Sequence, residues 1–176
     1  RKAIDLLAPY IDGMNIDIKG FTEEFYHEIC GGRLKPVLDA VKHAHDKGIW
    51  VEITTLLIPG KNDSDEEIRG IAKFIADVDP AMPWHLSAFH PTYKMLDVPR
   101  TPTSTLLRAY KIGQEEGLKY IYVGNVDDED HESTYCPGCG KRVIDRSGTI
   151  GQYVTNELDE NGTCPYCGYV LEGVWH

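Results

Sequence analysis

Apolar residues recur along the chain with two spacings, one typical of strands and one typical of helices. Alternation with a period of two, or a short unbroken apolar run, predicts four strands, at residues 13–19, 49–58, 84–89 and 119–124. Apolar residues three and four positions apart predict a helix that ends at Pro9 and longer helices before Gly48, after Ser64 and before Gly117. Strands that alternate with helices in this way predict βα units and a parallel sheet in sequential order.

Two of the helix starts carry capping signals. Thr22 precedes Glu23 and Glu24, whose negative charges suit the first turn of a short helix. Ser64 and Glu67 match a capping box, in which each side chain accepts a hydrogen bond from the other residue's amide. We therefore expect helices to begin at both places. Residues 94–102 contain two prolines and little periodicity, which predicts a loop.

One face of the predicted sheet is polar. Strands of a parallel sheet that is covered on both faces normally read as continuous apolar runs. Here the polar face carries Asn15, Asp17, Lys19, Glu52, Thr54, His85 and Ser87. Burying an unpartnered polar group costs about 1–3 kcal/mol, so we interpret this face as the lining of a polar cavity in a curved sheet, as inside an open barrel. A solvated face or a buried ion-pair network is the alternative.

Four cysteines near the C-terminus have the spacing of a metal site. Cys136-Pro-Gly-Cys139-Gly140 and Cys164-Pro-Tyr-Cys167-Gly168 are two CxxC pairs, which together can supply four thiolates to one tetrahedral ion. The glycine after each pair lets the chain turn close to the sulfurs with a positive φ. Residues 140–163 between the pairs suit a small β excursion that returns antiparallel. Zinc is the expected metal, and iron, two disulfides or unpaired thiols are the alternatives.

Composition excludes several classes of protein. Of the 176 residues, 41% are hydrophobic and 26% charged, as in a globular protein with a core. The net charge of −10 argues against a nucleic-acid backbone as the main partner, and no apolar run is long enough to span a membrane. Metal-spaced cysteines and the single Cys30, which reads as a small core residue rather than a nucleophile, favour the cytoplasm. We expect an α/β domain at residues 1–126, an acidic linker at 127–134 and a four-cysteine metal-binding module at 135–176.

Several of these segments resemble one enzyme superfamily. The segments are Asp12-Gly-Met-Asn-Ile-Asp-Ile-Lys-Gly20, Leu57-Ile-Pro-Gly-Lys-Asn-Asp63 and Ala88-Phe-His-Pro91 with Tyr93 beyond, and they come in the order seen in radical S-adenosylmethionine (SAM) enzymes. They are most similar to the branch of pyruvate formate-lyase activating enzyme. The ending, Tyr122-Val-Gly-Asn-Val126 with the two CPxCG pairs and Gly173-Val-Trp175, resembles the radical SAM member of the AmmeMemoRadiSam system. The resemblance covers nearly the whole chain, and the tail is its most specific part.

The resemblance implies a fold and a cofactor site. The fold is the C-terminal half of a partial (βα)6 TIM-like barrel, followed by a zinc-ribbon or rubredoxin-like module. SAM would lie at the C-terminal edges of the strands. Motif matching places Asp17 and Lys19 at the SAM ribose or carboxylate and His90 beside the cofactor, and the polar face adds Asn15, Glu52 and His85. Alternatively, Asp17 and Lys19 form a buried ion pair and His90 is a loop histidine bonded to the backbone.

The sequence departs from the superfamily at its cluster site. A radical SAM enzyme holds a [4Fe–4S] cluster with a CxxxCxxC motif, which this sequence does not contain. Four predicted strands are also too few for the barrel. We therefore expect the C-terminal portion of a longer enzyme, unable to cleave SAM by itself, whose unpaired barrel edge promotes self-association. The substrate, a protein or a small molecule, is not indicated.

Two further functions fit parts of the pattern. The CPxCG pairs also resemble rubredoxin, in which four cysteines hold a redox-active iron, so the chain could be an electron-transfer or adaptor module. Lys19 could instead form a Schiff base in a barrel lyase. Asp17 makes the lyase less favourable, because a neighbouring carboxylate keeps the amine protonated.

Overall fold

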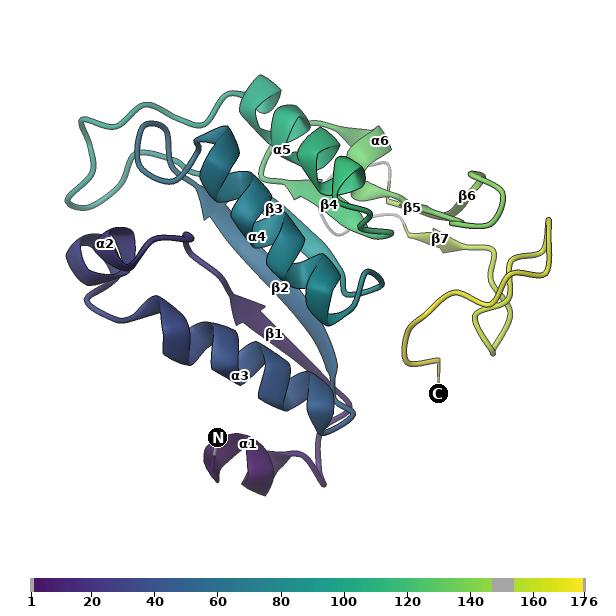
Figure 1. Ribbon diagram of the computed structural model, residues 1–176. Coiled ribbons are helices and arrows are strands. Elements are labelled where there is room, and N and C mark those ends of the chain that lie inside the picture. The colour runs from purple at the N-terminus through teal and green to yellow at the C-terminus, as the bar shows by residue number, and fades with distance from the viewer. Residues whose placement is uncertain (1, 147–153, 176) are drawn as a thin grey trace. The chain divides into compact units, whose positions relative to one another are not determined.

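Four parallel strands run side by side through the N-terminal part of the chain (Figure 1). The computed structural model describes residues 2–146 and 154–175. The described residues form two compact units, with residues 2–126 in the first and residues 127–146 and 154–175 in the second. The strands of the first unit are β1 (Gly13–Asp17), β2 (Trp50–Leu57), β3 (Trp84–Ala88) and β4 (Ile121–Gly124). They lie in the order β1-β2-β3-β4, and each neighbouring pair is parallel. The predicted α/β class and strand order are confirmed.

The helices of the first unit follow the predicted pattern, with one addition. They are α1 (Lys2–Leu7), α2 (Glu23–Phe25), the π-helix η1 (Tyr26–Cys30), α3 (Leu34–Asp46), α4 (Asp65–Val78) and α5 (Thr103–Glu115). Figure 1 shows α3, α4 and α5 on one face of the sheet. The π-helix was not predicted, because a five-residue turn of this kind leaves no periodic signal in the sequence.

Both predicted helix caps form, but only half of the capping box does. Thr22 Oγ1 accepts a hydrogen bond from Phe25 N at 3.1 Å, and Ser64 Oγ accepts one from Glu67 N at 3.2 Å. The Glu67 carboxylate does not return to Ser64; its Oε1 accepts from Phe21 N at 3.0 Å. The Phe21 ring packs against Gly70 one turn further along α4, which brings the Phe21 amide to the start of this helix.

All four strands are shorter than predicted, and β1 and β4 each lose two residues at one end. β1 ends at Asp17 rather than at residue 19. Ile18 N still donates to Thr54 O at 3.0 Å, but Lys19 N donates to the hydroxyl of Tyr26 at 3.0 Å and so leaves the sheet ladder. β4 begins at Ile121 rather than at residue 119, because Lys119 N donates to Pro80 O at 2.9 Å. Lys19 therefore lies just beyond the C-terminal end of β1.

The two faces of the sheet differ in burial. Along β2 and β3, every second side chain is buried. Among these, Val51, Ile53, Trp84 and Leu86 pack in the main hydrophobic core with the helices. The side chains between them are only partly buried. A second hydrophobic cluster contains Phe25, Tyr26, Leu34, Ile58, Phe89 and Val98. It joins residues that follow β1, β2 and β3, and so fixes the loops at the C-terminal edge of the sheet.

The second unit is a small antiparallel structure. Its described elements are α6 (Glu129–Glu132), β5 (Thr134–Tyr135), β6 (Arg142–Asp145) and β7 (Thr155–Asn156), with the sheet order β5-β6-β7. β6 and β7 pair antiparallel, as expected for a β excursion between the cysteine pairs, and residues 147–153 of that excursion lie outside the described residues. Residues 127–134, which the sequence predicted as a linker, contain α6 and the first residue of β5.

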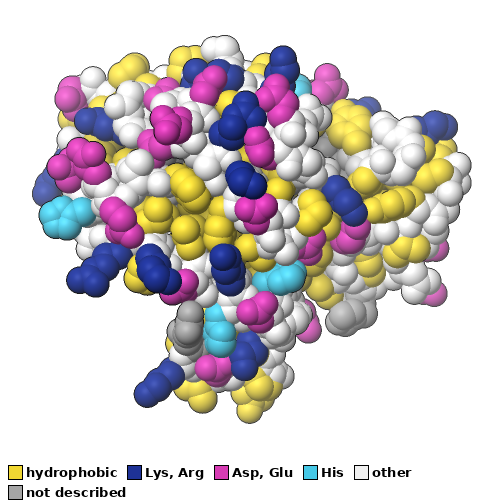
Figure 2. All heavy atoms as spheres, viewed as in Figure 1, with side chains coloured by type: hydrophobic (Ala, Val, Ile, Leu, Met, Phe, Trp, Pro, Cys, Tyr) yellow, Lys and Arg dark blue, Asp and Glu magenta, His cyan; other side chains and the backbone are white. Residues whose placement is uncertain are grey.

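Charged side chains of both signs are interspersed over the face shown in Figure 2. Ion pairs within helices include Lys35 with Asp39 at 2.9 Å and Lys73 with Asp77 at 3.3 Å. Exposed pairs of this kind contribute about 0.3–0.5 kcal/mol each, so we interpret them as ordinary helix surface. Among the described residues, no helix has the length and apolar character needed to cross a membrane.

Candidate functional site

Four sulfur atoms gather in the second unit. The ligand atoms of Cys136, Cys139, Cys164 and Cys167 all lie within 4.8 Å of one another. Cys136 Sγ is 3.6 Å from Cys167 Sγ, and Cys139 Sγ is 3.8 Å from Cys164 Sγ. A tetrahedral ion with bonds of about 2.3 Å would separate its sulfurs by about 3.8 Å. The four cysteines, called the four-cysteine group below, could therefore hold one metal ion.

The two cysteine pairs have the same backbone fold. In the first, Gly140 N donates to Cys136 O at 2.8 Å, and Cys136 N donates to Lys141 O at 2.8 Å. In the second, the matching bonds join Gly168 N to Cys164 O at 2.9 Å and Cys164 N to Tyr169 O at 2.8 Å. The φ angles are 71° at Gly140 and 76° at Gly168, as the sequence predicted. These turns bring both sulfurs of each pair to the same point.

The thiols influence one another's ionisation. Burial raises the pKa of the Cys136 thiol. Burial also raises the pKa of Cys164, but two backbone N–H groups of its own turn and the neighbouring thiols outweigh burial and lower the pKa to about 7. The Tyr169 amide lowers the pKa of Cys167, but burial and the three neighbouring sulfurs raise it to about 12. At neutral pH the Cys136 and Cys167 thiols therefore stay protonated unless a cation compensates the charge of their thiolates.

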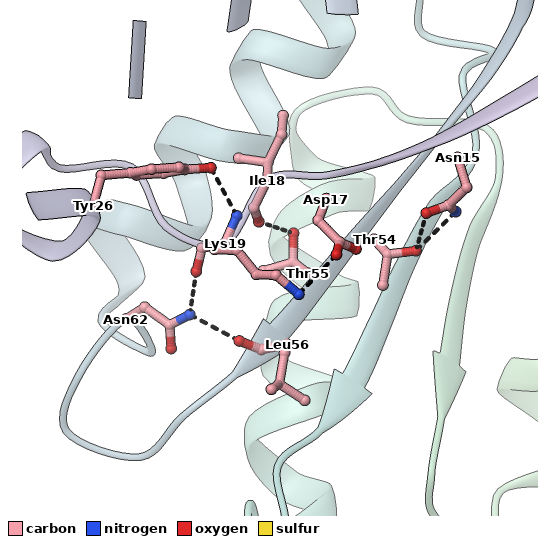
Figure 3. A network of polar contacts seen from close by, with 9 residues as sticks. All are labelled: Asn15, Asp17, Ile18, Lys19, Tyr26, Thr54, Thr55, Leu56 and Asn62. Carbon is pink, nitrogen blue, oxygen red and sulfur yellow. Dashed lines mark hydrogen bonds and ion pairs between the residues drawn. The ribbon is translucent and has the colours of Figure 1, made fainter. Parts of the chain in front are cut away.

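The candidate cofactor residues at the end of β1 form an ion pair. Lys19 Nζ lies 2.8 Å from Asp17 Oδ2 (Figure 3), and the two side chains are 42% and 45% exposed. Because the pair is this exposed, it is not the buried ion pair that the sequence left open as an alternative. A ligand on this face could reach one ammonium group and one carboxylate.

A second pair lies on the same face of β2 and β3. His85 Nε2 is 2.7 Å from Glu52 Oε2, and Trp50 Nε1 donates to Glu52 Oε1 at 3.1 Å. The His85 ring also stacks on Tyr122, with ring centroids 5.1 Å apart and planes at 24°. His85 and Glu52 are 34% and 38% exposed. The carboxylate and the stacking ring together fix the orientation of the imidazole.

The remaining candidates lie on either side of these pairs. Asn15 Nδ2 donates to Thr54 Oγ1 at 2.9 Å, between β1 and β2. Thr54 is the register partner of Asp17 on one side and of His85 on the other, so these three residues form one row across the sheet. His90 follows β3 in the loop at the C-terminal edge, and its side chain is exposed. The structure thus brings five of the six predicted cofactor residues onto one face, while His90 lies beyond it.

Three buried polar residues near Lys19 were not predicted. Tyr26, Thr55 and Asn62 all make hydrogen bonds to the backbone at residues 18–19. Their partners are 7, 37 and 43 positions away in the sequence. Asn62 lies in residues 57–63, one of the segments that resemble radical SAM enzymes. This was the only feature of the sequence that pointed to Asn62 as a functional residue. Nothing in the spacing of Tyr26 or Thr55 indicates this contact.

Comparison with known proteins relates the first unit to radical SAM proteins. The Radical SAM superfamily model matches residues 1–75. An uncharacterized protein of Methanocaldococcus jannaschii is 43% identical over 168 residues, which are 95% of this chain and 50% of that protein. The chain therefore spans about half the length of this curated relative.

Two solved structures have a similar fold. One is a domain of a pyruvate-formate lyase-activating enzyme from Bacteroides vulgatus, with a TM-score of 0.63 and 18% identity over 71% of this chain and 74% of that one. The other is a radical SAM methyltransferase from Sphaerobacter thermophilus, with a TM-score of 0.59 and 17% identity over 70% of this chain and 37% of that one. The first unit thus has the α/β fold and parallel sheet of a radical SAM domain, as the sequence resemblance implied.

The residues present do not fit the iron–sulfur cluster of that superfamily. Outside the four-cysteine group the chain has one further cysteine, Cys30, which is exposed and therefore is not the small core residue that the sequence predicted. A [4Fe–4S] cluster needs several thiolates, each on a different iron, and sulfurs on different irons lie farther apart than sulfurs that share one ion. The four-cysteine group, with all ligand atoms within 4.8 Å, suits a single ion.

Proposed function

We propose that residues 1–126 provide the SAM-binding part of a radical SAM enzyme, with SAM at the C-terminal edge of the sheet. The observation that carries this proposal is the exposed ion pair of Asp17 and Lys19 at the end of β1. In open α/β sheets, ligands bind beyond the carboxyl ends of the strands. The match to the Radical SAM superfamily over residues 1–75, which include this pair, supports SAM as the ligand.

Each side chain has a role that suits the chemistry of SAM. The Lys19 ammonium would pair with the SAM carboxylate, and the Asp17 carboxylate would accept hydrogen bonds from the ribose hydroxyls. His90 would lie beside the cofactor from the loop after β3. Asn15, Glu52 and His85 would form the polar floor of the pocket. Bound SAM would supply a sulfonium group for reductive cleavage.

The reductive step needs a cluster for which residues 1–176 supply no fitting set of thiolates. We propose that cluster-binding residues elsewhere in the whole protein hold it, so that residues 1–126 bind SAM but do not cleave it by themselves. The resemblance to the AmmeMemoRadiSam member and to activating enzymes supports an enzyme of that branch in the cytoplasm. Its substrate would be a protein or a small molecule that reaches the open polar face.

For the second unit, we propose a zinc-binding ribbon. The support is the four-cysteine group, whose sulfur spacing matches the edges of a tetrahedron around one ion. Iron in the same site would make the unit rubredoxin-like, with a role in electron transfer. Visible absorbance distinguishes the two metals, because ferric iron held by four thiolates absorbs and bleaches on reduction, whereas zinc is silent.

Titration of the whole protein with SAM tests the proposed cofactor site. Lys19→Ala removes a charge-assisted hydrogen bond to the bound cofactor, which is worth about 1.5–3 kcal/mol, or roughly a 10- to 150-fold weaker SAM affinity. Lys73→Ala on α4 is the matched control, because Lys73 has a similar ion pair, with Asp77, on the helical surface. Equal SAM affinities for both variants and the wild type would reject the site.

A further inference from the structure

The backbone around Lys19 is held by buried side chains instead of by the sheet. The last register pair of β1 is Asp17 with Thr54, so the peptide groups on either side of Lys19 need other partners. Figure 3 shows Tyr26, Thr55 and Asn62 gathered around this short segment. They come from η1, from β2 and from the loop after β2. Three elements therefore converge on two peptide groups.

Tyr26 holds the amide side of Lys19. Lys19 N donates to the Tyr26 hydroxyl at 3.0 Å, and the Tyr26 side chain is buried. The neighbouring Phe25 ring packs so closely on Gly20 that a Cβ at residue 20 would lie 2.6 Å from the ring. Gly20 thus allows the close approach that brings Tyr26 to Lys19. Burial raises the pKa of Tyr26, so its hydroxyl stays protonated at neutral pH.

Asn62 holds the carbonyl side of Lys19. Its Nδ2 donates to Lys19 O at 2.6 Å and to Leu56 O at 2.8 Å, while its Oδ1 accepts from Ile58 N at 2.6 Å. Asn62 is fully buried, so its amide group is committed to these three backbone partners. Asn62 therefore links the carbonyl of Lys19 to the backbone of Leu56 and Ile58, where the chain leaves β2.

Thr55 holds the peptide group before Lys19. Its Oγ1 donates to Ile18 O at 2.9 Å and accepts from Trp84 Nε1 at 3.0 Å. Thr55 and Trp84 are both fully buried. The backbone at residues 18–19 is therefore connected through one hydroxyl to the largest side chain of the main core. A rigid connection of this kind fixes the direction in which the flanking side chains leave the backbone.

We infer that Tyr26, Thr55 and Asn62 are positioning residues. They hold the backbone at Lys19 so that the Lys19 ammonium group faces SAM. The inference rests on the proposed function, since it concerns the same site. Holding a binding side chain in place before the ligand arrives removes part of the ordering cost of binding. Loss of one of these hydrogen bonds should therefore weaken SAM affinity, because the three side chains would act through the backbone at Lys19.

Tyr26→Phe in the whole protein is the cleanest test, because it removes only the hydroxyl. We expect a roughly 2- to 10-fold weaker SAM affinity by isothermal titration calorimetry, since one hydrogen bond that fixes the site is lost. The matched control is Tyr120→Phe, which also alters a buried tyrosine, next to the N-terminal end of β4 and thus at the opposite edge of the sheet. Its SAM affinity should equal that of the wild type.

A double-mutant cycle with Lys19→Ala separates positioning from general stability. If Tyr26 acts through Lys19, Tyr26→Phe should change SAM affinity by less than about twofold when Lys19 is already alanine. The same fold-change in both backgrounds, or no change in the wild-type background, overturns the inference while leaving the proposed site intact. If Lys19→Ala alone leaves SAM affinity unchanged, the proposed function fails first, and the inference fails with it.

If Tyr26→Phe does not fold, Thr55→Val serves as a second variant, because valine has nearly the same shape as threonine. It removes the bond to Ile18 O and also the bond from Trp84 Nε1, and we expect the same pattern, a roughly 2- to 10-fold loss of SAM affinity that disappears in the Lys19→Ala background. Hydrogen–deuterium exchange of a peptide covering residues 18–20 should be faster in either variant. Unchanged exchange together with unchanged affinity would contradict the positioning role.

Discussion

Lys19 Nζ lies 2.8 Å from the Asp17 carboxylate, at the point where β1 ends and the chain leaves the sheet. The two side chains keep 42% and 45% of their surface exposed. A pair that solvent reaches this easily contributes about 0–1 kcal/mol to stability, because water screens the charges. The same exposure leaves both groups accessible to a ligand, so the pair is better suited to binding than to holding the fold.

The stability of the fold should therefore depend little on this pair. We predict that Lys19→Ala and Asp17→Asn each change the free energy of unfolding by less than about 1 kcal/mol, as measured by urea denaturation. A loss of about 3–5 kcal/mol for either variant is the signature of a buried ion pair, and it would contradict this interpretation.

A buried threonine at the C-terminal edge should contribute far more to stability. Thr101 Oγ1 donates to Leu57 O at 2.6 Å and accepts from Phe89 N at 2.9 Å, so it joins the ends of β2 and β3. Thr101→Val keeps the shape but leaves both backbone groups without this partner, and we predict a loss of about 2–4 kcal/mol in urea denaturation. Thr103→Val, at an exposed position two residues later, should change stability by no more than about 0.5 kcal/mol.

The four-cysteine group should bind one metal ion per chain. We predict zinc by elemental analysis and metal–sulfur distances of about 2.3 Å by X-ray absorption. Cys164→Ser should lose the metal and leave the second unit open to protease, since binding supplies roughly 10–16 kcal/mol to the folding of such modules. Cys30→Ser is the control, because Cys30 lies outside the group and should not affect metal content. A metal-free protein with a protease-resistant tail would refute this prediction.

The glycine that closes the second cysteine pair should tune metal affinity. Gly168 has a φ of 76°, and a side chain in this left-handed region costs about 1–2 kcal/mol. We predict that Gly168→Ala weakens the metal affinity roughly 5- to 30-fold in a competition titration with a chelator. Gly124→Ala is the control, since its φ is not positive and its added Cβ would meet no atom closer than 4.0 Å. Equal affinities for both variants would show that the turn tolerates a side chain.

The sequence was sufficient for features that depend on local pattern. The strand-like run at residues 49–58 predicted β2, and the CxxC pairs with their following glycines predicted both the cysteine group and the positive φ of those glycines. The polar face was also predicted, because its residues recur with a period of two on adjacent strands. The degree of burial of these residues, however, could not be predicted. The exposure of Asp17 and Lys19 depends on which parts of the chain cover this face of the sheet.

Features that depend on distant partners could not be predicted in the same way. The predicted end of β1, residue 19, was wrong because the Lys19 amide donates a hydrogen bond to the Tyr26 hydroxyl instead of to the neighbouring strand. Strand propensity does not indicate this contact. The Glu67 carboxylate was predicted to accept a hydrogen bond within its own helix cap. It instead accepts one from the amide of Phe21, 46 positions away. In both cases tertiary packing supplied a partner that the local motif did not include.

The most direct test of the SAM site combines two measurements on the same variants of the whole protein. SAM titrations and thermal melts should be carried out on the wild type, Lys19→Ala, Asp17→Asn and His90→Ala. We predict melting temperatures close to that of the wild type and a loss of SAM affinity that is largest for Lys19→Ala, at about 1.5–3 kcal/mol. Asp17→Asn should lose less, because an amide oxygen can still accept from a ribose hydroxyl. Large losses of melting temperature with wild-type SAM affinity would contradict the SAM site at the end of β1.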